Sequence, residues 1–329
     1  MSGGRRVGLL LALTALVALT GALLSPAFWQ GSTATFILQY LPILGVLAVA
    51  QALVILSGGP GIDLSVGSTL SLTGLAIAAL AAMGWPLVAA CAVGLVLGGA
   101  LGAANGWLVA VLGIPSLMAT LATMFLYGGL AVALTGGRPI GGLPDAFGWL
   151  AQGRILGVPN HAWAVLVPVA IAAHVGLTRT RAGAHLHAAG CDERSAYLAG
   201  VRVLRVRFWI YMLAGMLAAL GAIMDLSWFQ AARPDAGRGM ELLSVTIAVL
   251  GGVHIFGGEG RIPDVIAALL LVTTVQATMQ LANIPQAWQL GAVGLLLILS
   301  VTLHQGWGIL RAAIPVSYTH LTLPTILLV

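Results

Sequence analysis

The sequence contains no lysine and little charge of either sign. All 14 of its basic residues, histidine aside, are arginines, and charged residues make up 7% of the 329 positions. The absence of lysine excludes every chemistry that needs this side chain, including the phosphate-binding lysine of a P-loop, a Schiff base and a pyridoxal anchor. The chain therefore cannot hydrolyse ATP through a P-loop of its own.

Cysteine is scarce as well. Cys91 and Cys191 lie far apart without metal-ligand spacing, so neither a disulfide framework nor a cysteine zinc site is indicated. His185 and His187 alternate close to Arg181, but they lack a third ligand and the i, i+4 spacing of a helical zinc motif. We expect no metal site and no cofactor.

Apolar residues, in contrast, are abundant. They account for 60% of the chain, and charged residues for 7%. An average soluble protein carries about 25% charged residues, so the surface of this chain must face lipid. The apolar stretches are continuous rather than alternating, which indicates helices and not a barrel. The predicted fold class is all-α: a polytopic membrane bundle of about ten helices, packed through 44 glycines and many alanines.

Stretches of about 20 apolar residues, the length that crosses a bilayer as a helix, divide the chain into ten predicted spans. These cover positions 7–24, 36–57, 67–83, 86–111, 116–135, 161–177, 206–226, 241–257, 263–281 and 287–304. We expect the first span to be retained rather than cleaved as a signal peptide, because no convincing A-x-A-like site follows Leu24. All ten belong to one predicted transmembrane domain, residues 1–315.

Residues 316–329 differ in character from this domain. Threonine and leucine alternate there around Pro324, and the stretch is too short to span a membrane. It resembles stray translated sequence, so we expect no function from it.

The arginines are divided unevenly between the two sides of the predicted spans. If the N-terminus is cytoplasmic, ten lie inside and four outside. The inner group is Arg5, Arg6, Arg179, Arg181, Arg194, Arg202, Arg205, Arg207, Arg261 and Arg311, and the outer group is Arg138, Arg154, Arg233 and Arg238. Because cytoplasmic loops collect positive charge, we predict that both termini are cytoplasmic. The net charge of +5 then reflects orientation, and no nucleic-acid partner is expected.

The predicted cytoplasmic segment 178–207 holds about a third of all charged residues. Residues 188–199 contain no proline and no β-branched residue, and Gly200 follows as a helix stop, so we predict a surface helix over about 188–200. This helix either docks a cytoplasmic partner or belongs to a basic loop that only anchors its neighbouring spans. Its candidate contact residues are Asp192, Glu193, Arg194, Tyr197, Leu198 and Gly200.

Four motifs follow one another between positions 36 and 305. They are Gly61-Ile62-Asp63-Leu64-Ser65-Val66-Gly67-Ser68; Asn105-Gly106 with Ile114-Pro115-Ser116 and Ala119-Thr120-Leu121-Ala122-Thr123; Cys191-Asp192-Glu193-Arg194-Ser195-Ala196-Tyr197-Leu198-Ala199-Gly200-Val201; and Val249-Leu250-Gly251-Gly252-Val253 with Phe256-Gly257-Gly258-Glu259-Gly260-Arg261. In this order and spacing the chain resembles the permease subunits of bacterial ATP-binding-cassette sugar importers of the ribose, xylose and rhamnose type.

The resemblance implies a permease that works as a homodimer or close heterodimer in the lipid of the bacterial inner membrane. It also implies two cytoplasmic ATPase domains, which dock on the third motif as a coupling helix, and a periplasmic sugar-binding protein. The chain itself would then be no enzyme, which agrees with its lack of lysine. Cys191 and Asp192 replace the usual Gly-Asn, and Ala199 replaces a common serine, so the identity of the ATPase stays open, although Asp192 keeps a helix-start residue.

The residues do not identify the sugar. Residues 282–285 (Ala-Asn-Ile-Pro) and 255–258 (Ile-Phe-Gly-Gly) resemble the rhamnose or autoinducer-2 branch of the family. A ribose-like pentose is the other candidate.

A pathway for sugars needs neutral hydrogen-bonding side chains, because sugars are polyols and a fixed charge would demand a counter-charge. Each candidate could equally bond between helices. Asp63, which follows the helix-breaking run of residues 58–61, could equally cap a helix start. The candidates are Gln51, Asp63, Ser65, Asn105, Thr120, Thr123, Gln276, Gln280, Asn283 and Gln289.

Two outer loops are predicted, over residues 135–161 and 228–240. They are either ordinary solvated loops or the docking surface that the resemblance implies for the binding protein, reached through ion pairs. Their basic residues are Arg138, Arg154, Arg233 and Arg238.

Two other classes of membrane protein were compared with this interpretation. An ion-coupled secondary transporter of a small polar solute, the main alternative, needs ionisable residues within its spans, whereas the acidic residues here are predicted at span ends or in loops. An intramembrane enzyme needs a nucleophile and base, or a metal pair, at matched depth. No predicted span contains such a pair.

Overall fold

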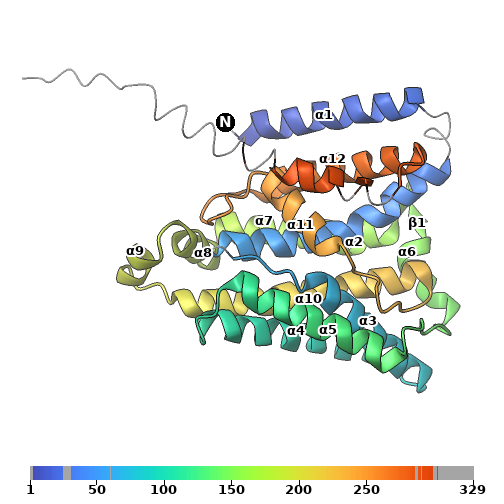
Figure 1. Cartoon of the computed structure of the whole chain (residues 1–329), viewed down its shortest axis with the longest axis horizontal. Coiled ribbons are helices and arrows are strands. Elements are labelled where there is room, and N and C mark those ends of the chain that lie inside the picture. Colours follow the sequence, from blue (N-terminus) through green and yellow to red (C-terminus); the bar gives the residue numbers. More distant parts are fainter. Residues whose placement is uncertain are drawn as a thin grey trace, which may run out of the picture.

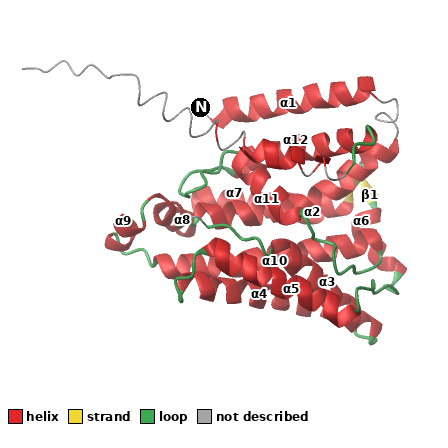
Figure 2. Cartoon of the chain, viewed as in Figure 1, coloured by secondary structure: helices red, strands yellow, loops and turns green. Residues whose placement is uncertain are grey.

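The computed structural model describes residues 3–24, 31–59, 61–285, 288–289, 291–298 and 302. Long helices lie side by side in one bundle (Figure 1). Strand structure among the described residues is limited to a hairpin of β1 (Arg154–Ile155) and β2 (Val158–Pro159), and helix dominates the rest (Figure 2). The predicted all-α polytopic class is confirmed.

Seven helices of the described part of the chain are long and apolar enough to cross a membrane. They are α1 (Gly3–Leu24), α2 (Gly31–Leu56), α4 (Leu87–Ala110), α5 (Ser116–Thr135), α7 (Val167–Arg179) with the π-helical turn η3 (Ala162–Leu166) before it, α10 (Val203–Phe229) and α12 (Ile262–Leu281). Two shorter apolar helices are α3 (Val66–Ala82), which matches the third predicted span, and α11 (Met240–Leu250), which covers only the first part of the eighth because the chain leaves the helix after Leu250. The tenth, residues 287–304, is described only in part, as helix at 288–289, 291–298 and 302. The tail 316–329 lies outside the described residues, and the number ten stays a prediction.

Helix α2 forms the centre of the bundle. Of the long apolar helices described, it is the most deeply buried, and it packs against α10, α11 and α12. A helix that is apolar all round is suited to such a position. In contrast, α1 exposes leucines along much of its length, for example Leu16 and Leu23.

Helices α4 and α10 approach one another closely through glycines. A Cβ added to Gly102 would overlap the carbonyl of Tyr211, and one added to Gly215 would overlap the carbonyl of Gly98. Because lipid provides no hydrophobic drive between helices, such close backbone contact is a main source of their association. The small residues of the sequence therefore have the packing role expected of them.

The two ends of the bundle differ. Helices α8 (Arg181–Cys191) and α9 (Glu193–Leu198) lie at one end, on the left of Figure 1, where α1 also begins. We name this the α9 end. The opposite β1 end carries the hairpin with η2 (Asp145–Gly148) and α6 (Trp149–Gln152).

Two connections enter the bundle from opposite ends. Residues 57–65 lead from the α9 end to the start of α3, and residues 230–239 lead from the end of α10 to the start of α11. The second connection packs against the first turn of α3, where a Cβ on Gly237 would overlap the carbonyl of Gly67. The Gly237 N–H also donates to the Ser71 hydroxyl at 3.0 Å, which ties the second connection to α3.

Candidate functional site

The connection between α2 and α3 is a buried turn closed by Asp63. Gly58 and Gly59 have φ angles of +78° and +61°, which favour glycine and end α2. The Asp63 side chain is buried, and its Oδ1 accepts hydrogen bonds from the Ser65 N–H at 2.8 Å and from the Ser65 hydroxyl at 2.7 Å. Asp63 therefore closes an Asx-type turn just before α3. Ser65 is the residue at the N-cap position of that helix.

Two amides from neighbouring helices satisfy the polar groups of this turn. When the Gln51 amide is oriented to match its partners, its nitrogen donates to the Asp63 carbonyl at 3.0 Å and its oxygen accepts from the Asp63 N–H at 3.2 Å. Asn105 on α4 donates to the Ser65 hydroxyl at 2.7 Å. Buried polar groups are costly without such partners, so both amides stabilise the break between α2 and α3.

The backbone of Ile62 is held from the other side of the turn. Its N–H donates to the Ser116 hydroxyl at 3.3 Å, and its carbonyl accepts from the hydroxyls of Thr120 at 3.1 Å and Tyr211 at 3.5 Å. Side chains of α2, α4, α5 and α10 thus converge on one turn. We name Gln51, Asp63, Ser65, Asn105, Ser116, Thr120 and Tyr211 the turn cluster.

Five of the predicted pathway residues belong to the turn cluster: Gln51, Asp63, Ser65, Asn105 and Thr120. Thr123 instead bonds to carbonyls of its own helix, α5. Gln276 and Gln280 lie on the last turns of α12, Asn283 follows that helix, and Gln289 donates to the Ile284 carbonyl at 2.9 Å.

Sequence reasoning missed two members of the turn cluster as functional residues. Ser116 lies within the second motif, and that was its only signal. Tyr211 is a lone tyrosine within an apolar span, and a buried tyrosine hydroxyl normally has a polar partner.

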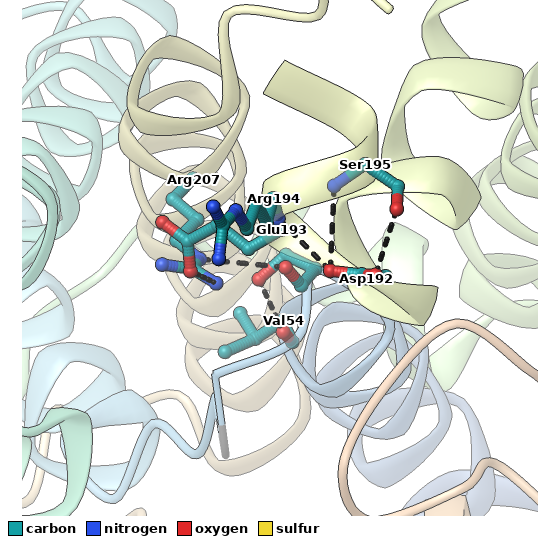
Figure 3. A network of polar contacts seen from close by, with 7 residues as sticks. Val54, Asp192, Glu193, Arg194, Ser195 and Arg207 are labelled. Atoms are coloured by element: carbon teal, nitrogen blue, oxygen red, sulfur yellow. Dashed lines mark hydrogen bonds and ion pairs between the residues drawn. The ribbon is translucent and has the colours of Figure 1, made fainter. Parts of the chain in front are cut away.

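The corner between α8 and α9 is built on Asp192. Its backbone is extended, with φ −157° and ψ 111°. Oδ1 accepts from the N–H groups of Arg194 at 2.9 Å and Ser195 at 3.4 Å, and Oδ2 accepts from the Ser195 hydroxyl at 2.8 Å (Figure 3). These bonds, led by the Ser195 hydroxyl, lower the pKa of Asp192 below its usual value. The single helix predicted over about 188–200 is therefore wrong: Asp192 ends α8 and caps α9, which makes two helices.

An ion pair joins α9 to the turn between α2 and α3. Nη2 of Arg207 lies 2.8 Å from Oε2 of Glu193, and Nε of Arg207 donates to the Ser57 carbonyl at 3.4 Å. The Ser57 hydroxyl in turn donates to the Val54 carbonyl at 2.7 Å (Figure 3). The Arg207 side chain is 11% exposed and that of Glu193 53%, so the arginine is the buried member. It connects a surface helix to the end of α2.

Helix α8 packs on the same region through backbone contacts. A Cβ on Gly190 would overlap the carbonyl of Leu56 and the N–H of Gly258. A ring nitrogen of His187, Nδ1, lies 2.9 Å from the Gly258 carbonyl, and the Cys191 thiol donates to the same carbonyl at 3.7 Å. The third and fourth motifs are therefore in direct contact.

The outward face of α9 combines exposed apolar and charged groups. Tyr197 and Leu198 are 72% and 78% exposed, and Gly200, with φ +84°, ends the segment. A hollow of about 700 Å³ beside them is lined by both acidic and basic residues. These are Asp192, Glu193, Arg194, Arg202 and Arg205, together with Tyr197, Val203 and Leu204. Exposed apolar side chains within a polar rim are typical of protein contact surfaces.

The four arginines predicted in the outer loops are not equivalent. Arg138, Arg154 and Arg238 are exposed, and Arg154 donates to the Thr35 hydroxyl at 2.8 Å. Arg233 turns inward: its Nη2 lies 3.6 Å from Oδ1 of Asp225, and its guanidinium lies 4.2 Å from the centre of the Phe229 ring. Its side chain thus already has partners within the chain.

The described helices form an apolar bundle. A buried polar turn lies between α2 and α3, and Arg207 joins it to the charged α8–α9 corner at one end. This arrangement suits a membrane permease. The chain belongs to the family described as branched-chain amino acid transport system / permease component, whose model matches residues 33–301. It is therefore a multi-pass inner-membrane transport subunit of an ATP-binding-cassette importer, and ATP hydrolysis belongs to a partner chain. These predictions from the sequence are confirmed.

Curated relatives are similar over most of the chain. The ribose import permease protein RbsC of Escherichia coli (strain K12) is 35% identical over 296 residues, which cover 89% of this chain and 91% of the relative. The autoinducer 2 import system permease protein LsrD of Klebsiella pneumoniae is 36% identical over 281 residues, covering 80% and 82%. RbsC of Bacillus subtilis (strain 168) is 34% identical over 286 residues, covering 86% and 88%. No solved structure matches the chain significantly.

Proposed function

We propose that the chain forms the membrane pathway for a monosaccharide or a related small polyol, and that an ATPase acts on it at α9. The observation that carries this proposal is the continuous set of contacts from Glu193 through Arg207 to Ser57 and the turn that precedes α3. Relatives whose names specify import of ribose and autoinducer 2 support the substrate class. Rhamnose, a ribose-like pentose and autoinducer 2 are the candidate substrates.

The proposed ATPase contact consists of the exposed residues of the α8–α9 corner. Tyr197 and Leu198 supply apolar area that this chain does not cover. The mixed charges beside them supply specificity, because complementary charge steers and orients a partner. The contact set is Asp192, Glu193, Arg194, Tyr197, Leu198 and Gly200.

The α9 end is the cytoplasmic end in this proposal. Nine arginines of the described part of the chain belong to segments at this end, which follows the positive-inside rule. They are Arg5, Arg6, Arg179, Arg181, Arg194, Arg202, Arg205, Arg207 and Arg261. With an even number of spans, both termini are cytoplasmic.

The β1 end is the proposed docking surface for a periplasmic sugar-binding protein. Arg138, Arg154 and Arg238 are its exposed cations, and they suit a partner with an acidic face. Arg233 contributes less, because Asp225 and Phe229 already engage it. A second permease subunit, identical or closely related, completes the proposed assembly.

The turn cluster is the proposed part of the pathway that responds to the ATPase. Its side chains are neutral apart from Asp63, as a polyol pathway requires. These side chains hydrogen-bond to one another and to the backbone of the turn. In this proposal the cluster is therefore a place where the backbone changes conformation, and not a preformed sugar site. Thr123, Gln276, Gln280 and Asn283 stay candidate pathway residues outside the cluster.

The test reconstitutes the permease in liposomes with its ATPase and its binding protein and measures uptake of labelled ribose, rhamnose and autoinducer 2. Reversal of both charges in Glu193→Arg/Arg194→Glu should abolish co-purification of the ATPase and ATP-dependent uptake. Arg179→Glu, a single charge reversal outside the corner, serves as the control and should retain both. Undisturbed co-purification in the double variant would overturn docking at α9, and uptake driven by an ion gradient without ATPase would favour the secondary transporter.

A further inference from the structure

A groove on the side of the bundle combines an apolar part with a basic part. The apolar part is a cavity of about 280 Å³ between α2, α7, α8 and α10. Except for Thr180, its wall consists of aliphatic side chains and glycines. Residues such as Leu53 on α2, Val169 on α7 and Leu217 on α10 contribute to it. A cavity of this composition has no polar group with which to hold a sugar.

The basic part adjoins it towards the α9 end. This second cavity, of about 530 Å³, lies between α8 and α10. The two cavities share Ala182, Leu186, Ile210 and Leu213 in their walls. A single elongated ligand could therefore occupy both.

The charge in the second cavity has one sign. Arg202, Arg205 and His185 line it, and no acidic residue does. The ion pairs found among the described residues are Arg207–Glu193 and Arg233–Asp225, so neither Arg202 nor Arg205 is neutralised by a carboxylate of that part of the chain. Arg202 and Arg205 also line the hollow beside α9, where acidic residues are present as well.

The position of the groove matches the boundary of a membrane. Trp209, on the second turn of α10, lies in the wall of the basic cavity and is 56% exposed. Tryptophan favours the interface between headgroups and hydrocarbon. Arg202 and Arg205 lie nearer the α9 end than Trp209, and Leu213 and Leu217 lie deeper along α10. The groove therefore runs from the headgroup region into the hydrocarbon.

We propose that this groove binds one phospholipid with an anionic headgroup. The phosphate and headgroup contact Arg202 and Arg205, and an acyl chain occupies the cavity between α2, α7 and α10. Basic pockets between membrane helices bind anionic headgroups in this way. A free phosphate would leave the apolar cavity empty, and a helix of a second permease would leave both arginines without a counter-charge.

The binding experiment uses the full chain. Delipidated permease in mild detergent receives equal amounts of phosphatidylglycerol and phosphatidylcholine, and native mass spectrometry counts the bound molecules. The wild-type chain should retain one phosphatidylglycerol in preference. Arg202→Gln/Arg205→Gln should lose about 25-fold of this preference, since each arginine contributes about fivefold. Arg179→Gln/Arg181→Gln removes the same charge from the same end but outside both cavities, and should keep the preference.

A second variant tests the apolar cavity. Gly176 lies in the wall of this cavity, and a Cβ added there meets no atom within 4 Å, so Gly176→Leu is chosen to reduce the space for an acyl chain. It should reduce retention of both lipids about fivefold. Gly129→Leu on α5, where a Cβ is equally unobstructed, should leave retention unchanged. Size-exclusion profiles and melting temperatures matching those of the wild-type chain establish that each variant is folded.

Three results would overturn the proposal. These are equal retention of the two lipids by the wild-type chain, an equal loss of preference in the Arg179/Arg181 control, and unchanged retention in Gly176→Leu. A dimer mass that disappears in Gly176→Leu would instead assign the groove to a second copy of the chain, which also contradicts the proposal.

Discussion

Arg207 lies between Glu193 and the end of α2, with its Nη2 2.8 Å from the Glu193 carboxylate and its Nε 3.4 Å from the Ser57 carbonyl. A single side chain of α10 thus contacts both the surface helix and the connection that leads to the turn cluster. Because this side chain is 11% exposed, water competes little for its bonds. In the proposed function, this residue is the link through which movement of α9 reaches the buried turn.

The first prediction concerns this link. Arg207→Gln should leave ATPase co-purification intact, because the exposed face of α9 is unchanged, while ATP-dependent uptake falls about tenfold, equivalent to about 1.4 kcal/mol. Arg181→Gln, at the same end of the bundle but outside the α9 corner and both cavities, is the control. Normal uptake in Arg207→Gln, measured in the reconstituted system, would show that Arg207 is not needed to couple α9 to the turn cluster.

The second prediction separates the two roles of Asp63. Asp63→Asn retains an oxygen that accepts the Ser65 hydrogen bonds, so it should be mild in stability and uptake. Asp63→Ala should lose about 1 kcal/mol, because Ser65 loses its partner. Thermal unfolding in detergent measures stability, and labelled-sugar uptake measures function. A stable Asp63→Asn permease without uptake would show that the charge itself takes part in gating.

The third prediction concerns the contact between α4 and α10. Gly102→Ala places a methyl group against the carbonyl of Tyr211, so the two helices must separate. We expect a loss of about 1–3 kcal/mol in the free energy of unfolding. In Gly129→Ala the added Cβ meets nothing, and helix propensity should raise stability by up to about 1 kcal/mol. Equal melting temperatures of the two variants would contradict the close contact.

The fourth prediction concerns the pair formed by Arg233 and Asp225. Arg233→Ala leaves the carboxylate, whose side chain is 4% exposed, without its cation. Since the Arg233 side chain is 39% exposed, we expect a cost of about 1–2 kcal/mol, less than for a fully buried pair. Asp225→Asn combined with Arg233→Ala should recover part of this loss. A double variant as unstable as the sum of both single variants would exclude coupling between the two groups.

The fifth prediction concerns orientation. Reporter fusions after Gly113 and Arg181 should report cytoplasm, and fusions after Gly148 and Asp235 should report periplasm. Alkaline phosphatase, active only outside, and green fluorescent protein, fluorescent only inside, provide opposite signals at each site. A periplasmic signal at Arg181 would place α9 on the wrong side for a cytoplasmic ATPase.

Much of the fold could be predicted because apolar runs and their interruptions are local features of the sequence. Membrane helices match nine of the ten predicted spans, in full or, for α11, in part. The α8–α9 corner could not be predicted from helix propensity. The deciding contacts are the hydrogen bonds that the Asp192 carboxylate accepts from Arg194 and Ser195. An aspartate can cap a new helix or continue an old one, and helix propensity does not distinguish the two.

The turn cluster, too, could be predicted only in part from the sequence. Motifs identified Asp63, Ser65, Asn105 and Thr120, and Gln51 was identified as a polar residue in an apolar span. Such a side chain gives the same signal whether it lines a pathway or bonds a neighbour. Only the fold brings these residues, from α2, α4, α5 and the connection before α3, to one turn. Tyr211 and Ser116 joined them because a backbone break between α2 and α3 leaves N–H and C=O groups that need partners.

The contact between Gly67 and Gly237 bears on how the chain spans the thickness of the bilayer. At 1.5 Å per residue, α3 and α11, of 17 and 11 residues, are about 26 Å and 17 Å long, shorter than the roughly 30 Å of hydrocarbon in a bilayer. The backbone of Gly237, in the connection that leads to α11, lies directly against Gly67 in the first turn of α3. At this point a non-helical segment packs on the start of a short helix, so loop and helix together cover a depth that a single helix covers elsewhere in the bundle.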